Sequence, residues 1–352
     1  MHNQQVEAGA EPTIDAPVAA VRPLPPVLPG LALSIVLAVV ATVVGRRVPV
    51  VGPAVVAIVL GVLVRALLDP GSWASPGIAF SSRKLLQLAI VLLGTGLSLG
   101  TVVSVGVGSL PVMLVTLAAA LGGGRLVGRA LGIEAPLRTL LAVGTGICGA
   151  SAIAAVASVV EAEAVDVAYA ISTIFVFNVA AVLLFPPLGH MLALGPHAFG
   201  LWAGTAVNDT SSVVAAGYAY SHAAGDYAVV VKLTRTLMIV PIVIALSVLG
   251  RRAAAAAEPA RPRGWTRLVP LFLVGFVVAA AANSAGLVDA AARSDLSTVA
   301  LFLVAVALAA VGLSAQPARI RAAGFRPLLL GAALWAAVAS TSLAVQAVTA
   351  VL

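Results

Sequence analysis

The chain has 352 residues, of which 61% are hydrophobic and only 9% are charged, and its mean hydropathy is +1.12. Soluble domains carry about a quarter charged residues, so this composition excludes a soluble globular protein and predicts an all-α polytopic membrane protein. Because apolar runs recur along most of the chain, we expect a single transmembrane bundle surrounded by a lipid bilayer.

The net charge of +7 does not indicate a nucleic-acid partner, because the arginines lie in short gaps between apolar runs and no basic stripe carries aromatic residues. A single cysteine, Cys148, excludes an intrachain disulfide. No hydrolase elbow, phosphate-binding loop or metalloprotease motif is present. We therefore expect neither an enzyme nor a cofactor, and no metal site.

Residues 1–27 are polar and rich in proline, which predicts a disordered cytoplasmic tail before a single transmembrane domain over 28–352. Within that domain we distinguish about 11 apolar segments near the spanning length of roughly 20 residues. They lie at 28–45, 50–68, 84–99, 106–124, 137–160, 165–186, 198–222, 227–250, 267–285, 296–315 and 327–351.

Basic residues predict the orientation, because cytoplasmic loops are enriched in Lys and Arg. Three loops are basic, and they contain Arg125, Arg129 and Arg138; Arg251, Arg252, Arg261, Arg263 and Arg267; and Arg319, Arg321 and Arg326. Eleven crossings with the N-terminus inside and the C-terminus outside place all three loops in the cytoplasm, together with Arg83 and Lys84. Arg46 and Arg47 fall on the outer side of the membrane, which is the one violation of the rule in this topology. The stretch 251–266 is predicted to be a cytoplasmic linker.

Two segments are interrupted at their middle, the fifth by GTGICGAS (144–151) and the seventh by GTAVNDTSS (204–212). Both predict broken or re-entrant helices at bilayer depth. A half-helix that begins at such a break directs its free N–H groups at a bound anion, and unwound carbonyls can hold a cation. For 144–151, close helix packing through small residues is an equal alternative. For 204–212 a site is favoured, because an Asp at mid-membrane is costly.

Asp209, with Asn208, is the predicted ion-coupling residue, with H+ or Na+ as the coupling ion; the alternative is a permanent ion pair with a buried base. Lys232 and Arg235 share one helical face, where they suit an oxyanion unless they snorkel from a helix end. The predicted substrate ligands are Gly144, Thr145, Gly146, Cys148, Gly149, Ser151, Thr205, Asn208, Thr210, Ser211, Ser212, Lys232 and Arg235.

Two pairs of similar sequence segments suggest internal repeats. Gly-Leu-Ser at 96–98 precedes Pro111 by the same distance as Gly-Leu-Ser at 312–314 precedes Pro327, and 144–152 is similar to 204–212. The two pairs are separated by different numbers of residues and do not fit one tandem duplication, so at most one pair reflects a repeat.

The motifs GTGICGASAIAA, FGLWAGTAVNDTSSVVAAG and VKLTRTLMIVP together resemble the YeiH-like family of proposed sulfate exporters, over roughly residues 30–350. That family is similar to cation/proton antiporters and bile-acid symporters. The resemblance implies two inverted five-helix repeats plus one helix, with crossing broken helices. The family pattern is matched at Ile147, Cys148, Gly149, Ser151, Asp209, Val213, Val214, Lys232, Arg235 and Pro241.

The sequence departs from that pattern at Gly146, where Ser is usual, at Asn208, where His is usual, and at Ser212, where Gln is usual. The loss of the His removes a side chain that titrates near neutral pH, which leaves proton coupling to Asp209.

The leading functional hypothesis is a secondary active transporter that moves a sulfate- or sulfonate-like anion across the bacterial inner membrane by alternating access. The first alternative is a sodium/proton-type cation antiporter that uses Asn208 and Asp209. The second is a membrane scaffold or sensor without transport activity. A homodimer is compatible with each of them.

Overall fold

The computed structural model describes residues 27–47, 52–68, 70–253, 270–314 and 324–349. The predicted tail (1–27) and linker (251–266) lie almost wholly outside these ranges. The described residues are helical and contain no strand, so the chain is an all-α polytopic membrane protein, as its composition predicts.

Among the described residues, seven helical segments are long and apolar enough to cross a membrane, and two shorter apolar helices accompany them. In chain order they are α1 (Leu28–Arg47), α2 (Gly52–Leu68), the continuous run α3 (Ser75–Phe80), η1 (Ser81–Leu85) and α4 (Leu86–Gly94), α5 (Leu99–Ala130), α8 (Ala164–Met191), α11 (His222–Thr236) with α12 (Ile239–Ala253), α13 (Leu271–Ser284), α14 (Ala290–Leu313) and α16 (Phe325–Val348).

The other two predicted segments are re-entrant hairpins. The first consists of α6 (Ala135–Gly146) and α7 (Ala150–Ala157), which pack along each other. A Cβ added at Gly144 would lie 2.9 Å from Cδ1 of Ile153, whereas nine residues of straight helix span about 14 Å. The chain therefore turns back at the Gly-rich break and returns to the side from which it entered.

The second hairpin consists of α9 (Pro196–Ala206) and α10 (Thr210–Tyr220). The rings of Phe199 and Tyr220, near its two open ends, stack with centroids 3.9 Å apart. Because α8 crosses the bundle between the two hairpins, they enter from opposite sides. Each returns to its own side, so the predicted positions of the three arginine-rich loops are unchanged.

One predicted boundary is wrong in a way that affects function. The third segment begins at Ser75, where Pro76 suits the first turn of a helix, and not near residue 84. Arg83 and Lys84 therefore lie within the helical run Ser75–Gly94 and not in a loop. The polar sequence SSRK obscured this, because it interrupts the hydropathy without interrupting the helix.

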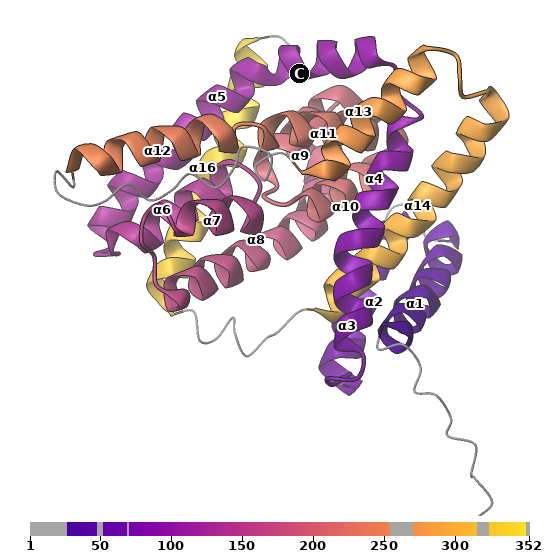
Figure 1. Ribbon diagram of the computed structural model, residues 1–352, viewed down its shortest axis with the longest axis horizontal. Coiled ribbons are helices and arrows are strands. Elements are labelled where there is room, and N and C mark those ends of the chain that lie inside the picture. The colour runs from indigo at the N-terminus through magenta and orange to yellow at the C-terminus, as the bar shows by residue number, and fades with distance from the viewer. Residues whose placement is uncertain (1–26, 48–51, 69, 254–269, 315–323, 350–352) are drawn as a thin grey trace, which may run out of the picture.

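The helices form two groups (Figure 1). The panel consists of α1, α2, α3–η1–α4, α13 and α14, which pack on one another; the core consists of α5, α8, α11, α16 and both hairpins. At the second hairpin, α10 packs against α2 and α14 of the panel. Among the described residues, α6 and α7 make no comparable packing with the panel. Within the described ranges, the core thus packs on the panel at the second hairpin and not at the first.

The two pairs of similar segments can be located in the fold. Residues 96–98 and 312–314 lie at the ends of α4 and α14, two helices that pack together, and residues 144–152 and 204–212 form the tips of the two hairpins.

Candidate functional site

The tips of the two hairpins meet inside the core. Gly149 in the first tip has φ +67°, a conformation that favours glycine. A Cβ added there would lie 3.4 Å from Cβ of Asp209 in the second tip. The glycine thus permits the turn that brings the two tips into contact.

Lys232 joins these tips. Its side chain is fully buried, so it does not snorkel. The Nζ atom donates to the carbonyl of Ile147 at 2.7 Å and to that of Val207 at 2.9 Å. These carbonyls follow directly after α6 and α9, at the negative ends of the two helix dipoles. One ammonium group therefore donates a hydrogen bond to a backbone carbonyl in each hairpin tip.

Arg235 lies one turn further along α11 and is 1% exposed. None of its three side-chain nitrogens has a hydrogen-bond partner among the described residues. A buried cation without a partner is costly, and a guanidinium offers five N–H donors. The arrangement thus leaves the donors of Arg235 available to a ligand or to water.

Asp209 is the N-cap of α10 and is half-buried. Its carboxylate accepts from the backbone N–H of Ser212 at 2.8 Å, from the Ser212 hydroxyl at 3.0 Å, and from the hydroxyl of Ser211. The predicted alternative, a permanent ion pair between Asp209 and a buried base, is not found: Lys232 donates to carbonyls, and the side-chain nitrogens of Arg235 have no partner among the described residues. The negative charge of Asp209 instead stabilises the positive end of α10.

The backbone N–H of Asn208, next to Asp209 in the chain, donates a hydrogen bond to a side chain of α8. The side-chain oxygen of Asn178 in α8 accepts from the N–H of Asn208 at 3.1 Å and from that of Asp209 at 3.3 Å. The Asn208 side chain is 1% exposed, and neither of its polar atoms has a partner in the described part of the chain. The side chain of Asn178 thus fixes the second tip.

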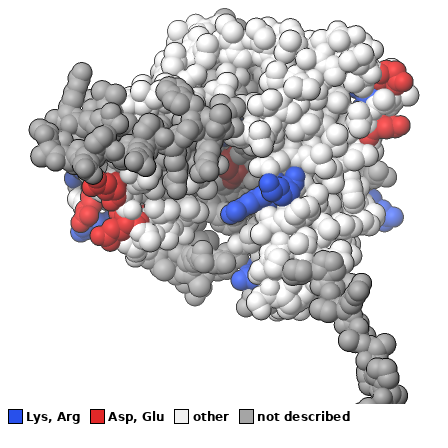
Figure 2. Space-filling view, viewed as in Figure 1, with Lys and Arg blue, Asp and Glu red and all other residues white. Residues whose placement is uncertain are grey.

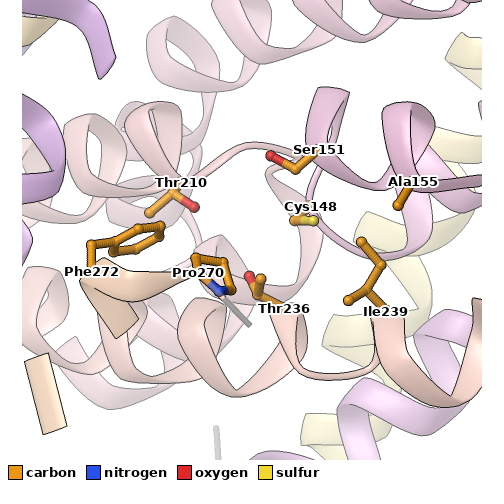
Figure 3. Close-up of a pocket in the computed structure, with 8 residues that line it drawn as sticks. All are labelled: Cys148, Ser151, Ala155, Thr210, Thr236, Ile239, Pro270 and Phe272. Atoms are coloured by element: carbon orange, nitrogen blue, oxygen red, sulfur yellow. The ribbon is translucent and has the colours of Figure 1, made fainter. Parts of the chain in front are cut away.

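A cavity of about 150 Å³ opens beside the tips (Figure 3). It is lined by Cys148, Ser151 and Ala155 of the first hairpin, Thr210 of the second, Thr236 and Ile239 after Lys232, and Pro270 and Phe272 at the start of α13. Residues of both groups of helices thus surround it. The α7 helix begins at this cavity, and its N-cap, Gly149, provides no side-chain acceptor for the first-turn N–H groups. Such an uncapped helix start attracts anions.

The remaining predicted ligands lie around the tips. Gly144 and Gly146 allow close packing, the first against Ile153 and the second against Leu117 and Ala120. The buried hydroxyl of Thr145 has no partner in the described ranges. Thr205 and Ser342 of α16 share a hydrogen bond of 2.7 Å, which ties the second hairpin to the core.

The sequence did not indicate several residues that line the cavity, namely Ala155, Thr236, Ile239, Pro270 and Phe272. Thr236 follows Lys232 by four residues, and this spacing on one helical face could have indicated it. Phe272 could not have been found in this way, because only tertiary packing brings α13 to the core.

Comparison with known proteins gives a consistent result. A family model described as "Conserved hypothetical protein 698" matches residues 29–331. A "UPF0324 membrane protein" of Clostridium tetani (strain Massachusetts / E88) is 39% identical over 315 residues, which cover 86% of this chain and 91% of the relative. "UPF0324 membrane protein M6_Spy0799" of Streptococcus pyogenes serotype M6 is 41% identical over 329 residues, covering 91% of this chain and 96% of that protein.

The fold and the paired hairpin tips define a multi-pass α-helical membrane protein with a polar centre inside its bundle. Within that class, the chain belongs to the UPF0324 membrane protein family. This is the YeiH-like family that the motifs resemble, so the predicted family is confirmed.

Proposed function

We propose that this protein is a secondary active transporter of a small oxyanion of the sulfate or sulfonate class, and that the anion binds beside the hairpin tips. The observation that carries the proposal is Arg235, a buried guanidinium without a protein acceptor among the described residues. A planar guanidinium fork matches the oxygen geometry of such anions.

The surrounding groups favour an anion over a neutral ligand. The start of α7, which has no side-chain cap from Gly149, lies at the cavity, and the hydroxyls of Thr210 and Thr236 face the same cavity as Cys148 (Figure 3). Lys232 adds a second buried positive charge. The one acidic side chain at the tips, Asp209, has its carboxylate engaged by Ser211 and Ser212.

The arrangement of the two hairpins supports transport. They enter from opposite sides and meet at the centre, as expected for a site that is exposed to each side in turn. Among the described residues, α10 packs on the panel whereas the first hairpin does not, so the two hairpins contact the panel unequally. In the proposed cycle this asymmetry reverses, and Asp209 provides the coupling to H+ or Na+.

The cation antiporter alternative has one observation in its favour, the unpartnered side chain of Asn208. Against it, the ammonium of Lys232 already occupies the two carbonyls at which an unwound helix would hold a metal cation. The anion hypothesis therefore has the stronger support.

Purified protein reconstituted in liposomes tests the proposal. We expect uptake of labelled sulfate or of a small sulfonate, and loss of that uptake in Arg235→Gln. Arg125→Gln serves as the matched control, because it removes an exposed arginine at the end of α5. Equal uptake by Arg235→Gln and the control would overturn the anion site.

A pH-sensitive dye inside the same liposomes addresses the alternatives. Proton flux driven by a sodium gradient without any anion would favour the antiporter. Absence of all flux, together with a partner that co-purifies, would favour a scaffold or sensor.

A further inference from the structure

The panel carries a pair of basic residues at an unusual depth. Arg83 and Lys84 lie in η1, within a continuous helical run of 20 residues from Ser75 to Gly94. At 1.5 Å per residue, Arg83 is about 12 Å from the start of that run, close to the middle of a bilayer core about 30 Å thick. Both side chains are nonetheless exposed. Charged residues at this depth rarely face lipid and usually mark a pathway.

The backbone at this point is also irregular. Ser81–Leu85 forms a π-helical turn between two α-helical segments, a feature that is frequent at functional sites. Ile78 and Leu86, on either side of it, are buried in the panel. The hydroxyl of Ser81 is buried and has no partner in the part of the chain that the structure describes. The turn thus keeps apolar neighbours in the panel and presents two cations on its opposite face.

That face borders the opening between panel and core. Figure 2 shows basic side chains over the region of η1, at the rim of a hollow that contains an acidic side chain at greater depth. The same panel wall continues into the cavity, because α4 packs against α13, and Phe272 at the start of α13 lines that cavity. Arg83 and Lys84 therefore lie on the panel wall that leads to the cavity beside the hairpin tips.

We propose that Arg83 and Lys84 form a recruitment site that captures the oxyanion at the rim of the hollow, before it reaches Arg235. This inference rests on the proposed function. A cationic pair beside a cleft with low-dielectric walls raises the local anion concentration and the rate of entry, typically by tenfold or more. Such a site determines how the protein performs when its substrate is scarce.

The test compares the η1 variant, Arg83→Gln/Lys84→Gln, with a control, the α5 variant Arg125→Gln/Arg129→Gln. The α5 variant removes two exposed arginines from the end of α5. Sulfate uptake into proteoliposomes is measured with the recruiting side facing the added anion, over a range of sulfate concentrations and at two ionic strengths. For the η1 variant we expect a roughly tenfold loss of uptake at low sulfate, recovery at high sulfate, and a weaker dependence on salt. The exchange Arg83→Lys/Lys84→Arg, which preserves the charge, should restore uptake at low sulfate.

Stabilisation by saturating sulfate in a thermal unfolding assay should be preserved in the η1 variant, which shows both correct folding and an intact inner site. If uptake by the η1 variant equals that of the α5 variant at every concentration, this inference is overturned and the proposed function stands. If the exchange variant folds but does not restore uptake, the inference is also overturned. If the unaltered protein shows no sulfate uptake and no stabilisation by sulfate, the proposed function fails and this inference fails with it.

Discussion

Lys232 and Arg235 lie one turn apart on α11 and are both buried, yet Lys232 donates to two backbone carbonyls whereas Arg235 donates to no described group. Two cations that the sequence predicts as a single anion-binding pair therefore have separate roles. Lys232 holds the hairpin tips together, and Arg235 remains available to a ligand. This difference leads to opposite expectations for their substitution.

Lys232→Met should destabilise the protein. The substitution removes two charge-assisted hydrogen bonds and leaves the carbonyls of Ile147 and Val207 without their donor. We expect a loss of about 3 kcal/mol in the free energy of unfolding, seen as a lower midpoint of thermal unfolding in detergent. Lys232→Arg keeps the charge and should recover part of the loss. A Lys232→Met protein as stable as the unaltered one would show that the carbonyls do not depend on this ammonium.

Arg235→Gln should not destabilise the protein in the absence of anions. No hydrogen bond within the described residues is lost, and a buried unpaired charge is removed, so the midpoint should be unchanged or higher. The increase in midpoint that sulfate causes in the unaltered protein should disappear. The same titration with chloride at equal ionic strength controls for general salt effects. A variant that sulfate still stabilises would exclude Arg235 as the anion ligand.

Asp209 can be tested with two substitutions that separate capping from charge. Asp209→Ala removes the N-cap of α10 and should lower the free energy of unfolding by about 1 kcal/mol. Asp209→Asn retains an acceptor for the N–H of Ser212 and should be nearly as stable as the unaltered protein. If Asp209 couples transport to H+ or Na+, Asp209→Asn should lose the response of anion uptake to an ion gradient. Unchanged coupling in a stable Asp209→Asn protein would limit Asp209 to its capping role.

Local composition was sufficient to predict the membrane class, the number of apolar segments and the two interruptions. Hydropathy detects runs such as 137–160, and Gly-rich stretches with polar residues mark the breaks. Composition could not distinguish a broken helix from a hairpin. That distinction depends on whether distant residues approach each other, as Phe199 approaches Tyr220.

The candidate site was predicted by residue type, and the role of each residue depends on tertiary contacts. A lysine and an arginine three residues apart look equivalent in sequence, but only Lys232 is placed beside Ile147 and Val207. In the same way, Arg83 and Lys84 were assigned to a loop because a polar run normally ends an apolar helix. In the structure the helix continues through both residues, which lie in the π-helical turn Ser81–Leu85.

Gly149→Ala tests the contact between the two tips. At φ +67° an alanine is strained, and its Cβ would lie 3.4 Å from Cβ of Asp209 and 3.6 Å from the carbonyl oxygen of Asn208. We expect the free energy of unfolding to fall by about 1–2 kcal/mol. Because the strain acts at the tip and Arg235 remains in place, sulfate should still stabilise the variant, although a higher concentration should be needed. Gly108→Ala is the matched control, since an added Cβ on that helical glycine meets no atom within 4 Å. If both alanine variants have the midpoint and the sulfate response of the unaltered protein, Gly149 does not need its left-handed conformation, and the contact between the tips does not hold the site together.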